Sequence, residues 1–259
     1  MTPEEQVAEN MKKREDQRAK RKRTPASRAR RIAIIAALAA LVAFSLSGFF
    51  TTKSIEVNGN TYFTDTEIIE MAHAETGRNL IYNPGIRQIK DYLLQNPYIQ
   101  SVEVHRKLPG TLIITVKERT QIAAIQYGDE YLVIDRNGIL LRKTETPPKV
   151  TMLTGIKIKK ATLGEPLEAK NASVFKDALA LLGKMDDGGI YFIRIEMSEM
   201  YIKCYVYESL VVSGAIKEVE SSIDDGHIQQ ILEKLFAKNI KRGTIAISED
   251  GYASFTPDV

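Results

Sequence analysis

The residues that could form a catalytic centre are scattered along this chain of 259 residues. Ser173 and Lys176 match the Ser-x-x-Lys spacing of penicillin-binding enzymes, in which the serine is the nucleophile. Neither of the accompanying motifs, Ser-Asp-Asn and Lys-Thr-Gly, occurs in the chain. Ser173 also precedes apolar residues at helical spacing, where a helix N-cap is expected. We therefore interpret Ser173 as a cap and not as a nucleophile.

The candidate metal ligands show no ligand spacing either. The chain has no His-x-x-x-His or Cys-x-x-Cys pair, and its three histidines lie far apart: His73, His105 and His227. The acidic pairs Asp186-Asp187 and Asp224-Asp225 do not fit a twelve-residue calcium loop and lie where turns are expected. The sequence predicts no enzyme, no metal, no cofactor and no small-molecule substrate. Surfaces that bind other molecules therefore remain as the candidate functional sites.

Cys204 is the only cysteine, so an intramolecular disulfide is impossible. It lies in the alternating run Tyr201–Tyr207, which is typical of a half-buried strand. We therefore expect Cys204 to be a small core residue, with a reactive thiol as the alternative.

One uncharged stretch, Ile32–Phe50, separates two flanks that differ in their number of basic residues. At ~1.5 Å per residue a helix of this length spans roughly 30 Å, the thickness of a bilayer core. We predict a transmembrane helix over residues 32–52. Residues 1–31 carry eleven Lys or Arg, whereas the twenty residues after the span carry only Lys53. The N-terminus is therefore expected in the cytoplasm and the rest outside, as in a single-pass type II protein.

Two other interpretations of this stretch exist. A buried core helix would keep a polar stripe, and this one offers only Ser45 and Ser47. A cleaved signal peptide would use the small-x-small pattern of the same two serines, but Phe49 and Phe50 continue the apolar run beyond that point. A retained anchor is favoured.

Residues 1–31 are too polar to bury a core, so the basic tail is predicted to be disordered, or at most to form a short helix near Glu4–Arg18. Its basic run is suited to anionic headgroups. Because no aromatic residues interleave with the bases, nucleic-acid binding is not predicted.

The next segment has the order strand, helix, helix, strand, strand. Ser54–Asn58 alternates as a strand does, and Thr64 with Glu67 forms a capping box that opens the first helix. Asn83 and Pro84 open a second helix. Two strands, 99–106 and 111–118, flank a reverse turn and form a hairpin. The pattern predicts helices on one face of a three-stranded sheet.

This segment resembles a POTRA domain, and more closely that of the FtsQ/DivIB family of bacterial cell-division proteins. The matching stretches are Ser54–Asn60, Asn79-Leu80, Asn96–Val104 and Arg106–Arg119. The Leu-Pro-Gly-Thr-Leu run and the Val-Lys-Glu-Arg ending, following a single N-terminal span, are the most specific.

From Gln121 onward short strands predominate. Helices are expected at 173–184 and 225–238, and a strand from Leu210 is expected to extend toward Val219. The last hairpin pairs 243–248 with 252–255. This part resembles the family's β domain through Val133–Leu140, Pro148–Gly155 and Gly243–Pro257. Unlike some members, the chain has no extra tail after its last strand and no tryptophan.

The predicted fold class is α+β. Its parts are a disordered cytoplasmic tail, a transmembrane helix, a POTRA domain (β-α-α-β-β) and a strand-rich β domain with two helices. The expected boundaries are 1–31, 32–52, 53–119 and 120–259.

The last strand is predicted to present an unpaired edge to which an extended partner adds a strand. The alternative is that the edge is covered internally. The resemblance implies that the β domain binds DivIC/FtsB-like and FtsL-like division proteins in this way. The predicted partner-binding residues are Ile245, Ile247, Tyr252, Ser254 and Phe255.

The resemblance implies a bitopic scaffold in the cell membrane at the division septum. Its POTRA domain would help localise it, and its β domain would hold partners that control septal peptidoglycan synthesis. Two alternatives are a POTRA-type chaperone or transport module for exported polypeptides and an unrecognised cell-wall enzyme.

Overall fold

The computed structural model describes residues 3–20, 25–83 and 85–257, and Pro84, the predicted helix opener, lies outside this range. The chain divides into two compact units. The first comprises Met1–Glu56, Ala74–Gly85 and His105–Ile113, and the second comprises Val57–His73, Ile86–Val104 and Ile114–Val259. The domain boundaries expected from the sequence stay predictions.

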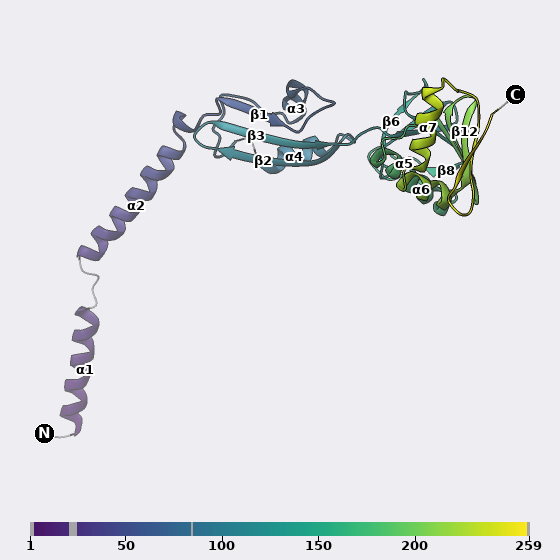
Figure 1. Ribbon diagram of the computed structural model, residues 1–259. Helices are drawn as coiled ribbons and strands as arrows, with labels where there is room; N and C mark the ends of the chain where they lie inside the picture. Colours follow the sequence, from purple (N-terminus) through teal and green to yellow (C-terminus); the bar gives the residue numbers. More distant parts are fainter. Residues whose placement is uncertain (1–2, 21–24, 84, 258–259) are drawn as a thin grey trace. The chain divides into compact units, whose positions relative to one another are not determined.

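The N-terminal segment is helical where it is described. Helix α1 spans Pro3–Lys20 and helix α2 spans Pro25–Ser45 (Figure 1). The predicted disorder of the tail is therefore wrong for these residues, and the alternative of a helix near Glu4–Arg18 is observed. The physical reason is composition, because α1 consists largely of Ala, Glu, Gln, Lys and Arg, which lose little freedom in a helix.

Helix α2 ends earlier than the predicted limit of the span at residue 52. A turn follows Ser45, and a 3₁₀ helix, η1, spans Gly48–Phe50. The Ser45 hydroxyl donates to the Val42 carbonyl over 2.7 Å, and the Asn79 side chain donates to the Ser45 carbonyl over 2.9 Å. These bonds satisfy carbonyls at the helix end. In the part of the chain that the structure describes, no helix has both the length and the apolar character needed to cross a membrane.

The predicted order strand, helix, helix, strand, strand is confirmed. A three-stranded sheet has the order β1-β3-β2. The Thr64 hydroxyl accepts the Glu67 N–H over 3.3 Å, and the Glu67 carboxylate accepts the Thr64 N–H over 2.8 Å, so the capping box is present. The elements are β1 (Ser54–Asn58), α3 (Asp65–Met71), α4 (Ile86–Leu94), β2 (Ile99–Lys107) and β3 (Thr111–Glu118).

The second unit contains a nine-stranded mixed sheet of order β14-β13-β12-β11-β10-β7-β4-β5-β6. Three pairs, β4–β7, β7–β10 and β12–β13, are parallel. The strands are β4 (Ala123–Tyr127), β5 (Glu130–Ile134), β6 (Leu140–Thr144), β7 (Thr151–Thr154), β10 (Arg194–Met197), β11 (Tyr201–Tyr207), β12 (Leu210–Ala215), β13 (Gly243–Ile247) and β14 (Ala253–Thr256). A separate ribbon joins β8 (Ile158–Lys160) to β9 (Glu168–Ala169).

Within residues 120–257 the structure has three helices and not the predicted two: α5 (Ala172–Asp187), α6 (Ile216–Asp224) and α7 (His227–Ala237) (Figure 1). The strand predicted to run toward Val219 ends at Ala215, where α6 begins. Ile216, Val219 and Ile223 are buried at spacings of three and four, which is the helical period. Residues 216–219, which the alternating pattern predicted to be strand, are therefore helical because this conformation buries their apolar side chains.

Ser173 does not cap α5. Asn171 is the N-cap, and its side chain accepts the Val174 N–H over 3.3 Å, which places Ser173 in the first turn. The predicted buried strand position of Cys204 is confirmed, since it is fully buried in β11. Burial raises the pKa of the Cys204 thiol well above its usual range, which keeps the thiol protonated.

Candidate partner-binding edge

The last two strands form an antiparallel hairpin at one end of the nine-stranded sheet. The Ser248 N–H donates to the Tyr252 carbonyl over 3.0 Å, and the Gly251 N–H donates to the Ser248 carbonyl over 2.9 Å. Gly251 has φ +77°, a left-handed conformation that glycine adopts without steric cost. Ala246 lies opposite Ser254 and Ile245 lies opposite Phe255. The turn therefore fixes the register of β14.

The five predicted partner-binding residues lie in two different environments. Ile245 and Ile247 belong to the hydrophobic core, with 0% and 7% of their surface exposed. Phe255 is half-buried against that core. Tyr252 and Ser254 are exposed, Tyr252 to 74%. The two isoleucines therefore hold the hairpin in place, and only Tyr252 and Ser254 offer freely accessible side chains.

The backbone of β14 has a free side. Strand β14 is the last in the sheet order, and among residues 3–20, 25–83 and 85–257 its only strand partner is β13. Bonded and non-bonded residue pairs alternate along an antiparallel ladder. Because Ser248 and Tyr252 form a bonded pair, Ser254 bonds inward to Ala246.

The same alternation turns the N–H groups of Ala253 and Phe255 to the open side. Their N–H and C=O groups are available to an added strand. The sequence prediction includes Ser254 and Phe255 but not Ala253, and their roles in partner binding stay predictions.

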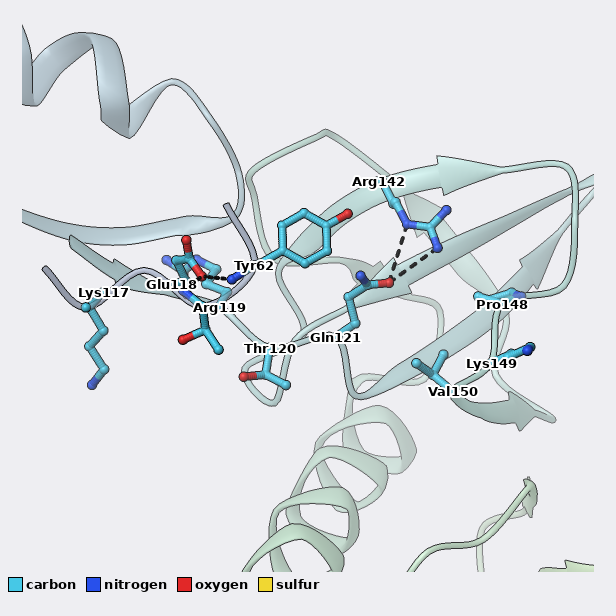
Figure 2. A pocket seen from close by; sticks show the side chains of 12 residues that line it. Tyr62, Lys117, Glu118, Arg119, Thr120, Gln121, Arg142, Pro148, Lys149 and Val150 are labelled. Atoms are coloured by element: carbon cyan, nitrogen blue, oxygen red, sulfur yellow. Dashed lines mark hydrogen bonds between the residues drawn. The ribbon is translucent and has the colours of Figure 1, made fainter. Parts of the chain in front are cut away.

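A second candidate is a pocket of about 680 Å³ that lies wholly within the second unit (Figure 2). The Glu118 carboxylate accepts the backbone N–H groups of Thr61, Tyr62 and Phe63 over 2.8, 2.6 and 3.2 Å. The Arg142 guanidinium donates to the Gln121 side chain over 3.3 and 3.4 Å. These charged groups already have partners inside the protein.

Arg119, which also lines the pocket, forms an ion pair with buried Asp135 at 2.9 Å. Asp135 in turn accepts the N–H groups of Asn137 and Ile139. Arg119, like Glu118 and Arg142, is therefore held by interactions within the protein. Within the described ranges, no group of three or more His, Cys, Asp or Glu residues is arranged to hold a metal ion.

Comparison with known proteins gives a consistent result. A profile for the POTRA domain, FtsQ-type, matches residues 50–119. The cell division protein DivIB of Clostridium acetobutylicum is 28% identical over 208 residues, which cover 78% of this chain and 81% of that protein. The cell division protein FtsQ of Geobacter sp. (strain M21) is 27% identical over 167 residues, which cover 63% of this chain and 59% of that protein.

A solved structure of the major extracytoplasmic domain of DivIB from Geobacillus stearothermophilus also aligns with this chain. The alignment covers 42% of this chain and 87% of that one, with 17% identity and a TM-score of 0.29. The sequence matches thus support the relationship, and this low structural score adds nothing to it.

Proposed function

Since this chain belongs to the FtsQ/DivIB family of cell-division proteins and carries an FtsQ-type POTRA domain, we propose that it is a bitopic scaffold of the division machinery. In this proposal it binds other single-span division proteins outside the cytoplasmic membrane and thereby helps control septal peptidoglycan synthesis. Its role is binding and not catalysis.

The observation that carries the proposal is the open side of β14. Each strand added to such an edge gains main-chain hydrogen bonds without requiring a preformed cavity. Exposed Tyr252 stands beside this edge and can cover apolar side chains of a partner, as aromatic anchors do at many interfaces. We propose DivIC/FtsB-like and FtsL-like proteins as the partners.

The anchor is the second part of the proposal. Large apolar side chains of α2 are exposed on all sides of the helix, and a water-soluble surface rarely carries so continuous a patch. They include Ile32, Ile35, Leu38, Leu41 and Phe44. Together with the basic flank, they support insertion in the membrane with the N-terminus in the cytoplasm.

The binding role is tested with the full chain in detergent or nanodiscs. We expect it to capture a DivIC-like protein with an FtsL-like protein from the same cell, and not unfolded exported polypeptides or glycan fragments. Selective capture of unfolded polypeptides would support a chaperone module instead. Turnover of a glycan fragment would show an enzyme.

The anchor is tested separately. A reporter fused after Val259 should be active only outside the cytoplasm, and the protein should stay with membranes through a high-salt wash. Release of a shortened soluble form would identify Ser45–Ser47 as a processing site and refute the anchor.

A further inference from the structure

Three segments of the first unit meet at the C-terminal end of α2. They are Ser45–Lys53, Gly77–Tyr82 and Lys107–Gly110, which we call the collar. The Tyr82 hydroxyl lies 2.6 Å from the Ser45 hydroxyl, and the Leu80 N–H donates to the Phe50 carbonyl over 2.7 Å. The end of the apolar helix is thus bonded directly to the loop that follows α3.

Further backbone bonds fix the rest of the collar. Thr52 donates to the Arg78 carbonyl and accepts the Gly77 N–H, both over 2.8 Å. Lys53 donates to the Gly110 carbonyl over 2.7 Å. A Cβ atom added at Gly110 would lie 2.9 Å from the Thr51 carbonyl oxygen, so the hairpin turn lies directly against this segment. The collar is therefore joined to the helix end through several backbone hydrogen bonds.

The outer surface of the collar combines apolar and cationic side chains. Phe49 and Tyr82 are each 54% exposed, and Leu108, in the β2–β3 turn, is 57% exposed. The rings of Phe44, Phe49 and Phe50 contact one another with centroids 5.1 to 5.7 Å apart. Exposed Lys53 and Lys107 lie on the same segments. Aromatic rings with nearby lysines are typical of the membrane–water interface.

Helix length gives a reason for such a surface. The uncharged part of α2, Ile32–Ser45, has about 14 residues, which at ~1.5 Å each is roughly 21 Å, short of the ~30 Å bilayer core. Additional apolar surface beyond Ser45 would relieve this mismatch. The collar supplies it at the matching end of the helix.

We propose that the collar is a lipid-binding surface, sunk into the headgroup region of the outer leaflet. Phe49, Tyr82 and Leu108 contact acyl chains, while Lys53 and Lys107 contact lipid phosphates. The inference rests on the proposed membrane anchor. Its consequence is that the first unit is held at the bilayer and does not move freely on a tether.

The absence of tryptophan from the chain makes a direct test possible. Leu108→Trp and Tyr82→Trp each introduce a sole tryptophan into the full chain, which is placed in nanodiscs containing anionic phospholipid with or without brominated acyl chains. Phe44→Trp reports on the anchor itself. Tyr191→Trp, at an exposed tyrosine of the second unit, is the matched control.

We expect the emission of Leu108→Trp and Tyr82→Trp to shift to shorter wavelength and to lose most of its intensity with brominated lipid. Tyr191→Trp should keep its intensity. Quenching of Phe44→Trp without quenching at positions 82 and 108 would overturn the collar proposal and leave the anchor intact. Absence of quenching at Phe44→Trp would refute the anchor. Equal quenching of all four variants would show that the contact is not specific to the collar and would also overturn the proposal.

Discussion

The two edge strands of the nine-stranded sheet, β6 and β14, differ in how far their open sides are covered. At β6, the Leu140 N–H donates to the Glu165 carbonyl over 3.0 Å, and the Gly164 N–H donates to the Leu140 carbonyl over 2.9 Å. A register shift interrupts the β5–β6 pairing, and Arg142 and Lys143 follow. At β14, Ala253–Thr256 carries no charge, and no such backbone cover is found within the described ranges.

Proteins protect exposed edges with covering loops, bulges and charged side chains, because an open edge invites pairing with other chains. Strand β6 has all three protections, whereas β14 has none of them among the residues that the structure describes. This contrast fits the proposal that the edge of β14 binds a partner.

The largest effect is expected from Gly243→Ala. Gly243 has φ +130°, and an added Cβ would lie 2.5 Å from the Phe255 ring and 2.6 Å from the Thr256 carbonyl oxygen. Overpacking of this kind costs ~1–3 kcal/mol, before any backbone strain is added. Thermal unfolding should show a clear loss of stability, and partner binding should fall with it.

Gly251→Ala is the matched control, because Gly251 also has a positive φ but nothing lies within 4 Å of its added Cβ. Gly251→Ala should therefore lose less stability than Gly243→Ala, because only backbone strain opposes it. Equal destabilisation by the two variants would mean that contact between β14 and Gly243 does not hold the hairpin.

Tyr252→Ala comes next. The side chain is largely exposed, so the free energy of unfolding should change little. Truncating an aromatic anchor typically costs more than ~1–2 kcal/mol, roughly ten-fold in affinity. Titration calorimetry with a DivIC-like partner measures this loss, and unchanged affinity would exclude Tyr252 from the interface.

Ala253→Pro should weaken binding by about five-fold, because a lost ladder bond is worth ~1 kcal/mol net. Its N–H faces the open side, so the sheet's own ladder survives and melting should stay near wild type. Ser254→Pro removes an inward donor and should lower the melting temperature as well. Identical behaviour of the two variants would contradict the inferred orientation of β14.

The smallest effect belongs to the protected edge. Lys143→Ala on β6 should change both stability and partner affinity by less than ~0.5 kcal/mol, as exposed substitutions usually do. Circular dichroism and the same titration check this. A loss of binding comparable with that of Tyr252→Ala would move the interface to β6.

The sequence by itself determined the features that depend on neighbouring residues. The capping box of Thr64 and Glu67 predicted the start of α3, and the turn between 99–106 and 111–118 predicted the β2–β3 hairpin. The alternation of Tyr201–Tyr207 predicted that Cys204 is buried. Local motifs and a period of two suffice for such predictions, because the residues that decide them lie a few positions apart.

Only the tertiary structure decided the rest. Helix α6 begins where the β12 pattern appeared to continue, because burial of Ile216, Val219 and Ile223 outweighs strand propensity. The sequence predicted an edge at the last strand, but the sheet order and the turn register determine that the backbone N–H group of Ala253, and not that of Ser254, points to the open side of the sheet. These features depend on contacts between residues far apart in the chain, which a local pattern does not encode.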